Sequence, residues 1–146
     1  MRFVGKIGFV TGGGTGIGLA CARAVVAGGG RVMLAGRREE VVRASATPLG
    51  PNAAWVRCDV TDDASVDAAV ARTVEQFGGL HVAVNAAGQG SIGSVLNAST
   101  AEFAQTLDTN LTGVSAPCVP RRARCKVTPA ASSTSAQLPA HSRTGG

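Results

Sequence analysis

Five glycines between Val10 and Ala20, in the segment VTGGGTGIGLA, are the residues of this sequence best suited to binding a phosphate group. A short and mostly apolar stretch, Lys6–Val10, precedes them and is typical of a buried strand. A strand, a glycine turn and a helix in this order point backbone N–H groups and the positive end of the helix at an anion. A flexible linker is the alternative, but a linker need not lie between a strand and a helix. We therefore interpret the segment as a phosphate-binding turn.

The elements around this turn follow from the spacing of apolar residues. Small and apolar residues at helical spacing follow the turn until Gly28–Gly30, and the face that they form comprises Ile17, Ala20, Cys21, Ala24 and Val25. Further strands are indicated at Arg31–Ala35, Ala54–Cys58 and Leu80–Val84. The alternation predicts an α/β fold, a parallel sheet between two layers of helices.

A long amphipathic helix is expected between the third and fourth strands. Thr61 is its expected N-cap, and Gly78–Gly79 ends it. Its apolar face is expected to comprise Val66, Ala69, Val70, Thr73, Val74 and Phe77. His81 lies in the fourth strand, and we interpret this lone histidine as structural.

Another helix begins near Thr100, because Ser99 and Glu102 form a capping-box pattern. Apolar residues follow at four-residue spacing, namely Phe103, Leu107 and Leu111. Asn110 lies on the same helix but off that apolar stripe. The fold thus brings one amide side chain to a helix that follows the fourth strand.

Four motifs in this order resemble those of the classical short-chain dehydrogenases/reductases. They are Thr11-Gly12-Gly13-Gly14-Thr15-Gly16-Ile17-Gly18, Cys58-Asp59-Val60, Asn85-Ala86-Ala87-Gly88 and Asn110-Leu111-Thr112-Gly113. In the third motif, Ala86 replaces the second Asn of the family pattern. The resemblance covers residues 1–113 and, more weakly, 132–140. It implies a Rossmann-type fold, a doubly wound parallel sheet with the strand order 3-2-1-4 that is incomplete here after the fourth strand. It also implies that the fold binds NAD(P) and transfers a hydride between the nicotinamide and a carbonyl or alcohol substrate.

The resemblance also implies which residues form the site. The cofactor-binding residues that it implies are Thr11, Gly12, Thr15, Gly16, Ile17, Gly18, Asp59, Val60, Asn85, Ala86 and Gly88. Val60 and the preceding aspartate are implied to contact the adenine ring. Asn110 and Ser133 correspond to the asparagine and serine of the family's catalytic group.

The cofactor preference depends on the end of the second strand. A free ribose 2′-hydroxyl is usually held there by an acidic residue. Here the strand ends Ala35-Gly36-Arg37-Arg38, without a carboxylate before Glu39. The planar guanidinium of Arg37 suits a 2′-phosphate, so we predict NADP as the cofactor, with NAD as the alternative. Arg37 and Arg38 could also simply begin a solvated helix.

The rest of the family's catalytic group has no match in this sequence. The resemblance implies a tyrosine that exchanges the proton with the substrate oxygen and a lysine that lowers the pKa of this tyrosine. The chain contains no tyrosine, and its lysines, Lys6 and Lys126, do not fit the pattern. Counting from Ser133, the tyrosine is expected near Gly146.

Residues 114–131 also depart from the family pattern. Pro117 and Pro120 interrupt the helix that carries Asn110, and Pro129 fits poorly in a central fifth strand expected at residues 125–131. We therefore expect a truncated or disrupted family member. Residues 1–113 would form the NAD(P)-binding domain, and residues 114–146 a basic, Pro- and Ser-rich, weakly ordered tail.

Composition limits the partners. The net charge of +5 comes entirely from residues 114–146, because the nine basic and nine acidic residues before them cancel. Without interleaved aromatic residues, this pattern does not favour nucleic-acid binding. No apolar run approaches the roughly 20 residues of a membrane span. The four cysteines lack metal-ligand spacing, which predicts no metal site and favours a cytoplasmic location.

Three functions remain open at this stage. The first is an NAD(P)-dependent oxidoreductase acting on a small alcohol or carbonyl substrate. The second is a dinucleotide-binding remnant without turnover, which the lack of tyrosine favours for this chain. The third is an interaction protein that uses its basic tail. In each case, the loss of regular structure after residue 113 is expected to compromise the family's usual homo-oligomer.

Overall fold

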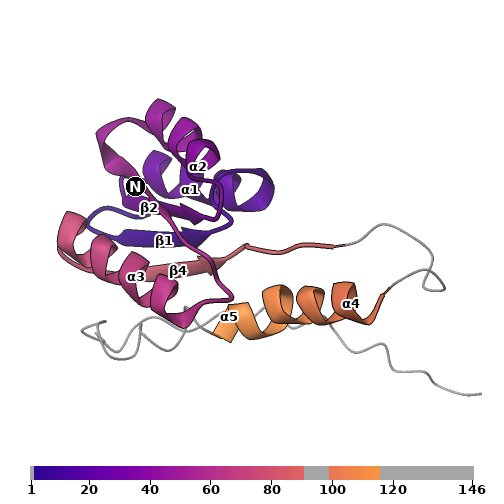
Figure 1. The fold of residues 1–146 in the computed structure, drawn as a ribbon. Helices are drawn as coiled ribbons and strands as arrows, with labels where there is room; N and C mark the ends of the chain where they lie inside the picture. Colours follow the sequence, from indigo (N-terminus) through magenta and orange to yellow (C-terminus); the bar gives the residue numbers. More distant parts are fainter. Residues whose placement is uncertain (1, 91–98, 116–146) are drawn as a thin grey trace, which may run out of the picture.

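The computed structural model of the protein describes residues 2–90 and 99–115, and these residues form a parallel α/β sheet fold (Figure 1). The strands are β1 (Ile7–Thr11), β2 (Arg31–Gly36), β3 (Ala53–Arg57) and β4 (Val82–Asn85). All pairs are parallel and the strand order is β3-β2-β1-β4. The order predicted from the sequence is therefore confirmed for the four strands of the described residues.

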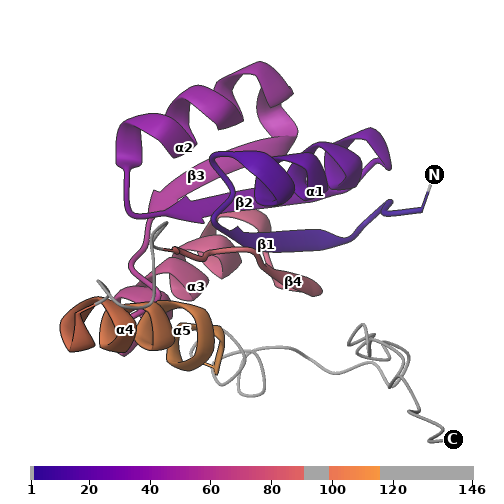
Figure 2. The same ribbon diagram turned by 90° about the vertical axis from the view of Figure 1, so that its right-hand side faces the viewer.

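Helices cover both faces of this sheet. Helices α1 (Gly16–Ala27) and α2 (Glu39–Ala46) lie on one side and α3 (Asp63–Phe77) on the other (Figure 2). A 3₁₀ turn, Thr47–Asn52, joins α2 to β3. After β4 come α4 (Thr100–Leu107), a π-helical turn (Asp108–Thr112) and the short α5 (Gly113–Ser115). The arrangement is the expected three layers.

Each face of the sheet has its own apolar core, because successive residues of a strand point to opposite sides. Phe9 of β1 and Met33 of β2 pack toward α3, in a cluster with Val66 and Val70. Val10, next to Phe9, packs toward α1 and α2 on the opposite face. Every residue of β1 is buried, as expected for a strand at the centre of a parallel sheet.

The buried face of α1 differs from the expected one. Its buried residues are Gly18, Ala22 and Val25, whereas Ile17 is 78% exposed; Ala20 and Ala24 are exposed too. The cause is Gly18, which lies so close to the carbonyl oxygen of Gly12 that this side of the helix must face the sheet. The apolar pattern indicated the helix correctly, but of the five residues that it singled out, Val25 alone is among the buried residues.

The start of α3 also differs from its prediction, although its apolar face is as expected. The N-cap is Asp62, whose side chain accepts a hydrogen bond from the Ala64 N–H at 3.0 Å. Thr61 precedes this cap, and its hydroxyl donates to Asp59 Oδ1 at 2.8 Å. Gly78 ends the helix in the left-handed conformation, with φ of 86°.

The last strand begins two residues later than expected, at Val82. His81 therefore precedes the strand, and its Nδ1 accepts the backbone N–H of Ile7 at 3.1 Å. The His81 backbone N–H in turn donates to the Ile7 carbonyl at 2.9 Å. The histidine joins β1 to the chain before β4, which agrees with its interpretation as structural.

The helix that carries Asn110 has the predicted capping box, with hydrogen bonds between Ser99 and Glu102 in both directions. Its apolar stripe is exposed: Phe103 is 63% and Leu111 68% exposed. The regular α-helix ends at Leu107, where the π-helical turn begins. The expected fifth strand and nearly all of the expected tail lie outside the described residues. No helix in the described ranges is long and apolar enough to cross a membrane.

Candidate functional site

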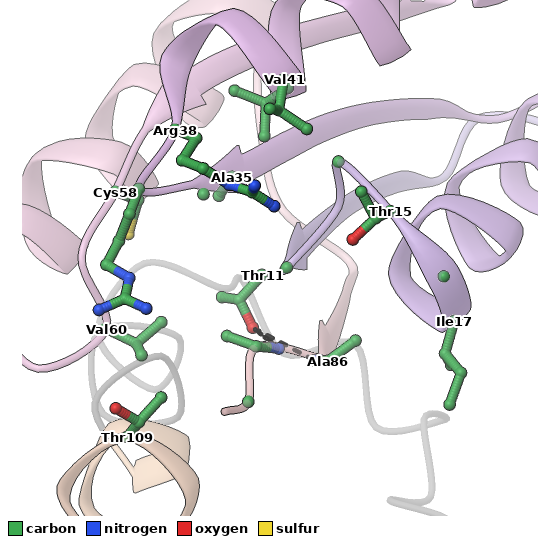
Figure 3. Close-up of a pocket in the computed structure, with 18 residues that line it drawn as sticks. Thr11, Thr15, Ile17, Ala35, Arg38, Val41, Cys58, Val60, Ala86 and Thr109 are labelled. Carbon is green, nitrogen blue, oxygen red and sulfur yellow. Dashed lines mark hydrogen bonds between the residues drawn. The ribbon is translucent and has the colours of Figure 1, made fainter. Parts of the chain in front are cut away.

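A pocket with a volume of about 560 Å³ lies at the carboxyl ends of the strands (Figure 3). Open parallel sheets bind their ligands at this edge. Nine of the sequence-predicted cofactor residues line the pocket: Thr11, Gly12, Thr15, Gly16, Ile17, Arg37, Val60, Ala86 and Gly88. The other three, Gly18, Asp59 and Asn85, do not line it.

Glycines form one wall of this pocket, and residues with a side chain would not fit there. Gly12 has φ of +64°, and a Cβ on it would lie 2.5 Å from the Ala86 carbonyl oxygen. A Cβ on Gly14 would lie 2.9 Å from Val41 Cγ1. Gly18 lies against Gly12, as described above. The turn from β1 into α1 is therefore a backbone-lined cradle that only glycine can form.

The start of α1 at this cradle can receive an anion. Its N-cap is Thr15, whose side chain makes no capping hydrogen bond, and its first turn contains no acidic residue. The N–H groups of a first helical turn have no partner within the helix, and the helix dipole adds a partial positive charge there. Gly16 and Ile17 line the pocket at this end. These features fit the pyrophosphate of a dinucleotide.

Thr11 fixes the geometry between the ends of β1 and β4. Its hydroxyl oxygen accepts the backbone N–H groups of Ala86 at 3.2 Å and Ala87 at 3.3 Å. The side chain is 2% exposed. Thr11 thus holds the chain after β4 beside the glycine turn, and so keeps the two walls of the pocket together.

A positive charge lies at the end of β2. Arg37 and Arg38 line the pocket, and Arg37 Nη2 donates to Gln89 Oε1 at 3.3 Å. None of the described residues that line the pocket is acidic. Helix α2 begins at Glu39, with Arg38 at its N-cap, so the solvated-helix interpretation applies from Glu39 on.

Asp59 lies behind this wall and organises the loop after β3. Its Oδ1 accepts the Thr61 N–H at 3.0 Å as well as the Thr61 hydroxyl. Burial alone would raise the pKa of this carboxyl, but the Thr61 hydrogen bonds and the charges of Arg37 and Arg57 outweigh it and lower the pKa. Asp59 is therefore ionised and holds Val60 in the pocket wall.

Cys58, at the start of this loop, lines the pocket as a buried thiol. Burial raises its pKa to about 11, although a hydrogen bond with Ser65 opposes the shift. A thiol with so high a pKa is not a nucleophile near neutral pH. The role of Cys58 is to pack within this wall.

Asn110 and Asn85 connect the last helical segment to β4. Asn110 Oδ1 accepts the Gln89 N–H at 2.9 Å, and its Nδ2 donates to the Gln89 carbonyl at 2.7 Å. Asn85 Nδ2 donates to the Val114 carbonyl at 3.4 Å. A Cβ on Gly113 would lie 2.8 Å from Val60 Cγ2, so this glycine allows the helical segment to approach the pocket wall.

Sequence reasoning missed one polar residue of the pocket. Thr109 lines it, is 4% exposed, and has a buried hydroxyl oxygen without a hydrogen-bond partner among the described residues. Its only signal in the sequence was its place next to Asn110. Ser133 lies outside the described residues. In residues 2–90 and 99–115, no three metal-ligating side chains come together.

The fold and this pocket define the class of protein: a Rossmann-type nucleotide-binding α/β protein. A sequence profile of the family described as short chain dehydrogenase matches residues 6–119. The chain therefore belongs to the short-chain dehydrogenase family, a family of oxidoreductases, and the resemblance seen in the sequence is confirmed.

Individual relatives agree with this assignment. The chain is similar to the 3-alpha-(or 20-beta)-hydroxysteroid dehydrogenase of Mycobacterium tuberculosis, with 42% identity over 113 residues, which cover 77% of this chain and 44% of that protein. It is similar to the 2,5-dichloro-2,5-cyclohexadiene-1,4-diol dehydrogenase of Sphingobium indicum, with 41% identity over 110 residues, 75% of this chain and 44% of that protein. The chain thus aligns with less than half the length of these relatives.

Solved structures share the fold. The 3-ketoacyl-(acyl-carrier-protein) reductase from Brucella melitensis complexed with NADH superposes with a TM-score of 0.79 at 27% identity, over 84% of this chain and 50% of that one. A short chain dehydrogenase from Mycobacterium smegmatis superposes with a TM-score of 0.74 at 33% identity, over 80% and 50% of the two chains.

Proposed function

We propose that this chain binds NADP in preference to NAD, as the cofactor-binding part of an NAD(P)-dependent oxidoreductase. One observation carries the proposal: a backbone-lined glycine cradle opens into a pocket that Arg37 and Arg38 line without any acidic residue among its described lining. A 2′-hydroxyl would call for a carboxylate at the end of β2. A 2′-phosphate instead suits a guanidinium, which binds it through paired charged hydrogen bonds.

Each part of the pocket has a proposed role toward the dinucleotide. The glycine turn and the first turn of α1 bind the pyrophosphate, and Arg37 binds the 2′-phosphate. Val60 packs against the adenine, while Asp59 holds the loop that carries Val60. Ala86 and Gly88 shape the wall after β4, where the small side chain of Ala86 leaves room for the ligand, and Asn85 supports this wall from behind. When bound, the cofactor supplies the hydride chemistry.

The substrate of the whole protein is proposed to be a small alcohol or carbonyl compound, in line with the names of the relatives. Asn110 is proposed to belong to the catalytic group, because it lies beside the end of β4 and is held by the Gln89 backbone. Ser133 keeps its proposed catalytic role by resemblance alone. Cys21 and Cys58 are free thiols, which is consistent with the proposed cytoplasmic location.

A second candidate function is cofactor binding without turnover. It is favoured by the composition of the chain, whose 146 residues include no tyrosine and so lack the proton donor that the resemblance implies. An assay that follows the absorbance of NADPH in the presence of a panel of ketones and aldehydes distinguishes the two functions. Turnover by the chain itself would eliminate the binding-only function.

Binding is tested by titrating the 146-residue chain with NADPH and with NADH in a calorimeter. The proposal predicts saturable binding of both, with the lower Kd for NADPH. Equal Kd values, or a lower Kd for NADH, would contradict the cofactor preference. Failure to bind either would contradict the proposed function as a whole.

A further inference from the structure

The hydroxyl of Thr109 is a buried polar group that forms no hydrogen bond within the part of the chain that the structure describes. The residue is 4% exposed, and its Oγ1 has no hydrogen-bond partner among the described residues. Buried hydroxyl groups are nearly always paired, because leaving one unpaired destabilises the protein. Thr109 also lines the pocket. An unpaired buried hydroxyl at a pocket wall indicates a partner that comes with the ligand.

Two threonines in α3 and α4 form the hydrogen bond that a helical threonine usually makes with the backbone. Thr73 in α3 donates its hydroxyl to the Ala69 carbonyl at 2.8 Å, and Thr106 in α4 donates to the Glu102 carbonyl at 2.8 Å. Both bonds reach back four residues along a regular helix. Thr109 lies in the π-helical turn instead. Such turns are rare and often occur at functional sites.

The position of Thr109 in the pocket indicates which part of the bound dinucleotide would contact it. Thr109 and Val60 lie together at the side of the pocket opposite Thr15 and Ile17 (Figure 3). The close approach of Gly113 to Val60 fixes the helical turn against this wall. If the pyrophosphate lies at the start of α1 and the ribose at Arg37, the base reaches the wall formed by Val60 and Thr109.

We propose that the Thr109 hydroxyl is a hydrogen-bonding residue for the adenine base of the bound dinucleotide. The inference rests on the proposed function, since it assigns a partner within the same pocket. Adenine offers an amino donor and ring-nitrogen acceptors, and a hydroxyl can donate or accept. A threonine in a helix populates two χ1 rotamers, so rotation about Cα–Cβ brings the hydroxyl from its buried position to the ligand.

The test is the binding of 2′,5′-ADP, the adenosine half of NADP, to the full chain and three variants. Thr109→Val replaces the hydroxyl with a methyl group of similar size and is expected to weaken binding about three- to tenfold, the worth of one hydrogen bond. Thr109→Ser keeps the hydroxyl and is expected to bind within about twofold of the unmodified chain. Thr106→Val is the matched control, because its hydroxyl lies in the preceding helix α4 and outside the pocket, and it is expected to leave the Kd unchanged.

Thermal unfolding without ligand separates binding from folding. Thr109→Val is expected to be at least as stable as the unmodified chain, because it removes an unpaired buried hydroxyl. If Thr109→Val binds 2′,5′-ADP as tightly as the unmodified chain, the inference is wrong while the proposed function stands. If the unmodified chain does not bind 2′,5′-ADP, both are wrong. Equal weakening by Thr109→Val and Thr109→Ser would also overturn the role of the hydroxyl.

Discussion

The side-chain amide of Asn110 forms two hydrogen bonds with the backbone of Gln89. Its Oδ1 accepts the Gln89 N–H at 2.9 Å, and its Nδ2 donates to the Gln89 carbonyl at 2.7 Å. The pair joins the π-helical turn to the chain that leaves β4. Gln89 in turn accepts a hydrogen bond from Arg37. The proposed catalytic asparagine and the proposed phosphate ligand are therefore linked through one residue.

Replacing Asn110 with alanine should make the chain around Gln89 more mobile. The Gln89 amide proton loses its acceptor, and its hydrogen exchange should accelerate about tenfold, as expected for one lost hydrogen bond. Exchange measured by mass spectrometry on a peptide that contains Gln89 would show this. Gln105→Ala, an exposed change on α4, is the control and should leave the exchange of that peptide unchanged. Unaltered exchange in Asn110→Ala would mean that the two hydrogen bonds do not hold the chain.

A side chain at Gly18 should destabilise the fold. A Cβ there would press on the Gly12 carbonyl, and overpacking of this kind costs roughly 1–3 kcal/mol. The cost appears even though alanine favours a helix more than glycine does. Urea unfolding of Gly18→Ala measures it. Gly90→Ala is the control, because no atom of the described residues lies within 4 Å of the added Cβ. Equal midpoints for the two variants would count against the cradle.

Acid should remove the stabilisation that Asp59 provides. Its pKa in the folded protein lies below the ordinary aspartate value, despite burial, because of Thr61, Arg37 and Arg57. The stabilisation is therefore complete above the ordinary pKa of about 4 and is lost as the pH falls through the lowered pKa. Asp59→Asn should be less stable than the unmodified chain at pH 7, and the two should converge only as the pH falls below the lowered pKa of Asp59. Asp67→Asn, an exposed change on α3, controls for the loss of one charge, and a constant gap across the pH range would contradict this account.

Cys58 should resist alkylation in the folded protein. Its pKa of about 11 leaves little thiolate at pH 8, and its side chain is buried. Peptide mass spectrometry after brief treatment with iodoacetamide should find Cys21 modified well before Cys58. In denaturant the two should react alike. Rapid modification of Cys58 in the native protein would show that the wall behind the pocket opens readily.

Local patterns in the sequence predicted the fold because each strand and turn carries its own signal. The alternation of elements predicted the parallel sheet, the resemblance supplied the strand order, and the capping box located α4. What the patterns could not show was which face of α1 is buried, because Gly18 has no apolar side chain and its packing depends on Gly12. The N-cap of α3 was misassigned because Thr61 and Asp62 are both good caps by residue type, and the helix begins after the second of them.

Site residues at strand ends and in the glycine turn could be predicted from the sequence. Residues whose role depends on contacts between distant side chains were harder to predict. Nine predicted cofactor residues line the pocket, because motif spacing fixes them to strand ends. Asp59 and Asn85 act behind the wall, through contacts that spacing does not encode. Thr109 had no signal of its own, since its burial arises only when the π-helical turn packs near Val60.

The central claim is that Arg37 recognises a 2′-phosphate, and calorimetry with NADPH and NADH on Arg37→Ala tests it most directly. A charged hydrogen-bond pair is worth about 1.5–3 kcal/mol, so the Kd for NADPH should rise at least tenfold while the Kd for NADH changes less than about twofold. Arg43→Ala removes the same charge from α2 outside the pocket and should leave both Kd values unchanged. Equal losses for the two cofactors in Arg37→Ala, or a loss for neither, would contradict the account.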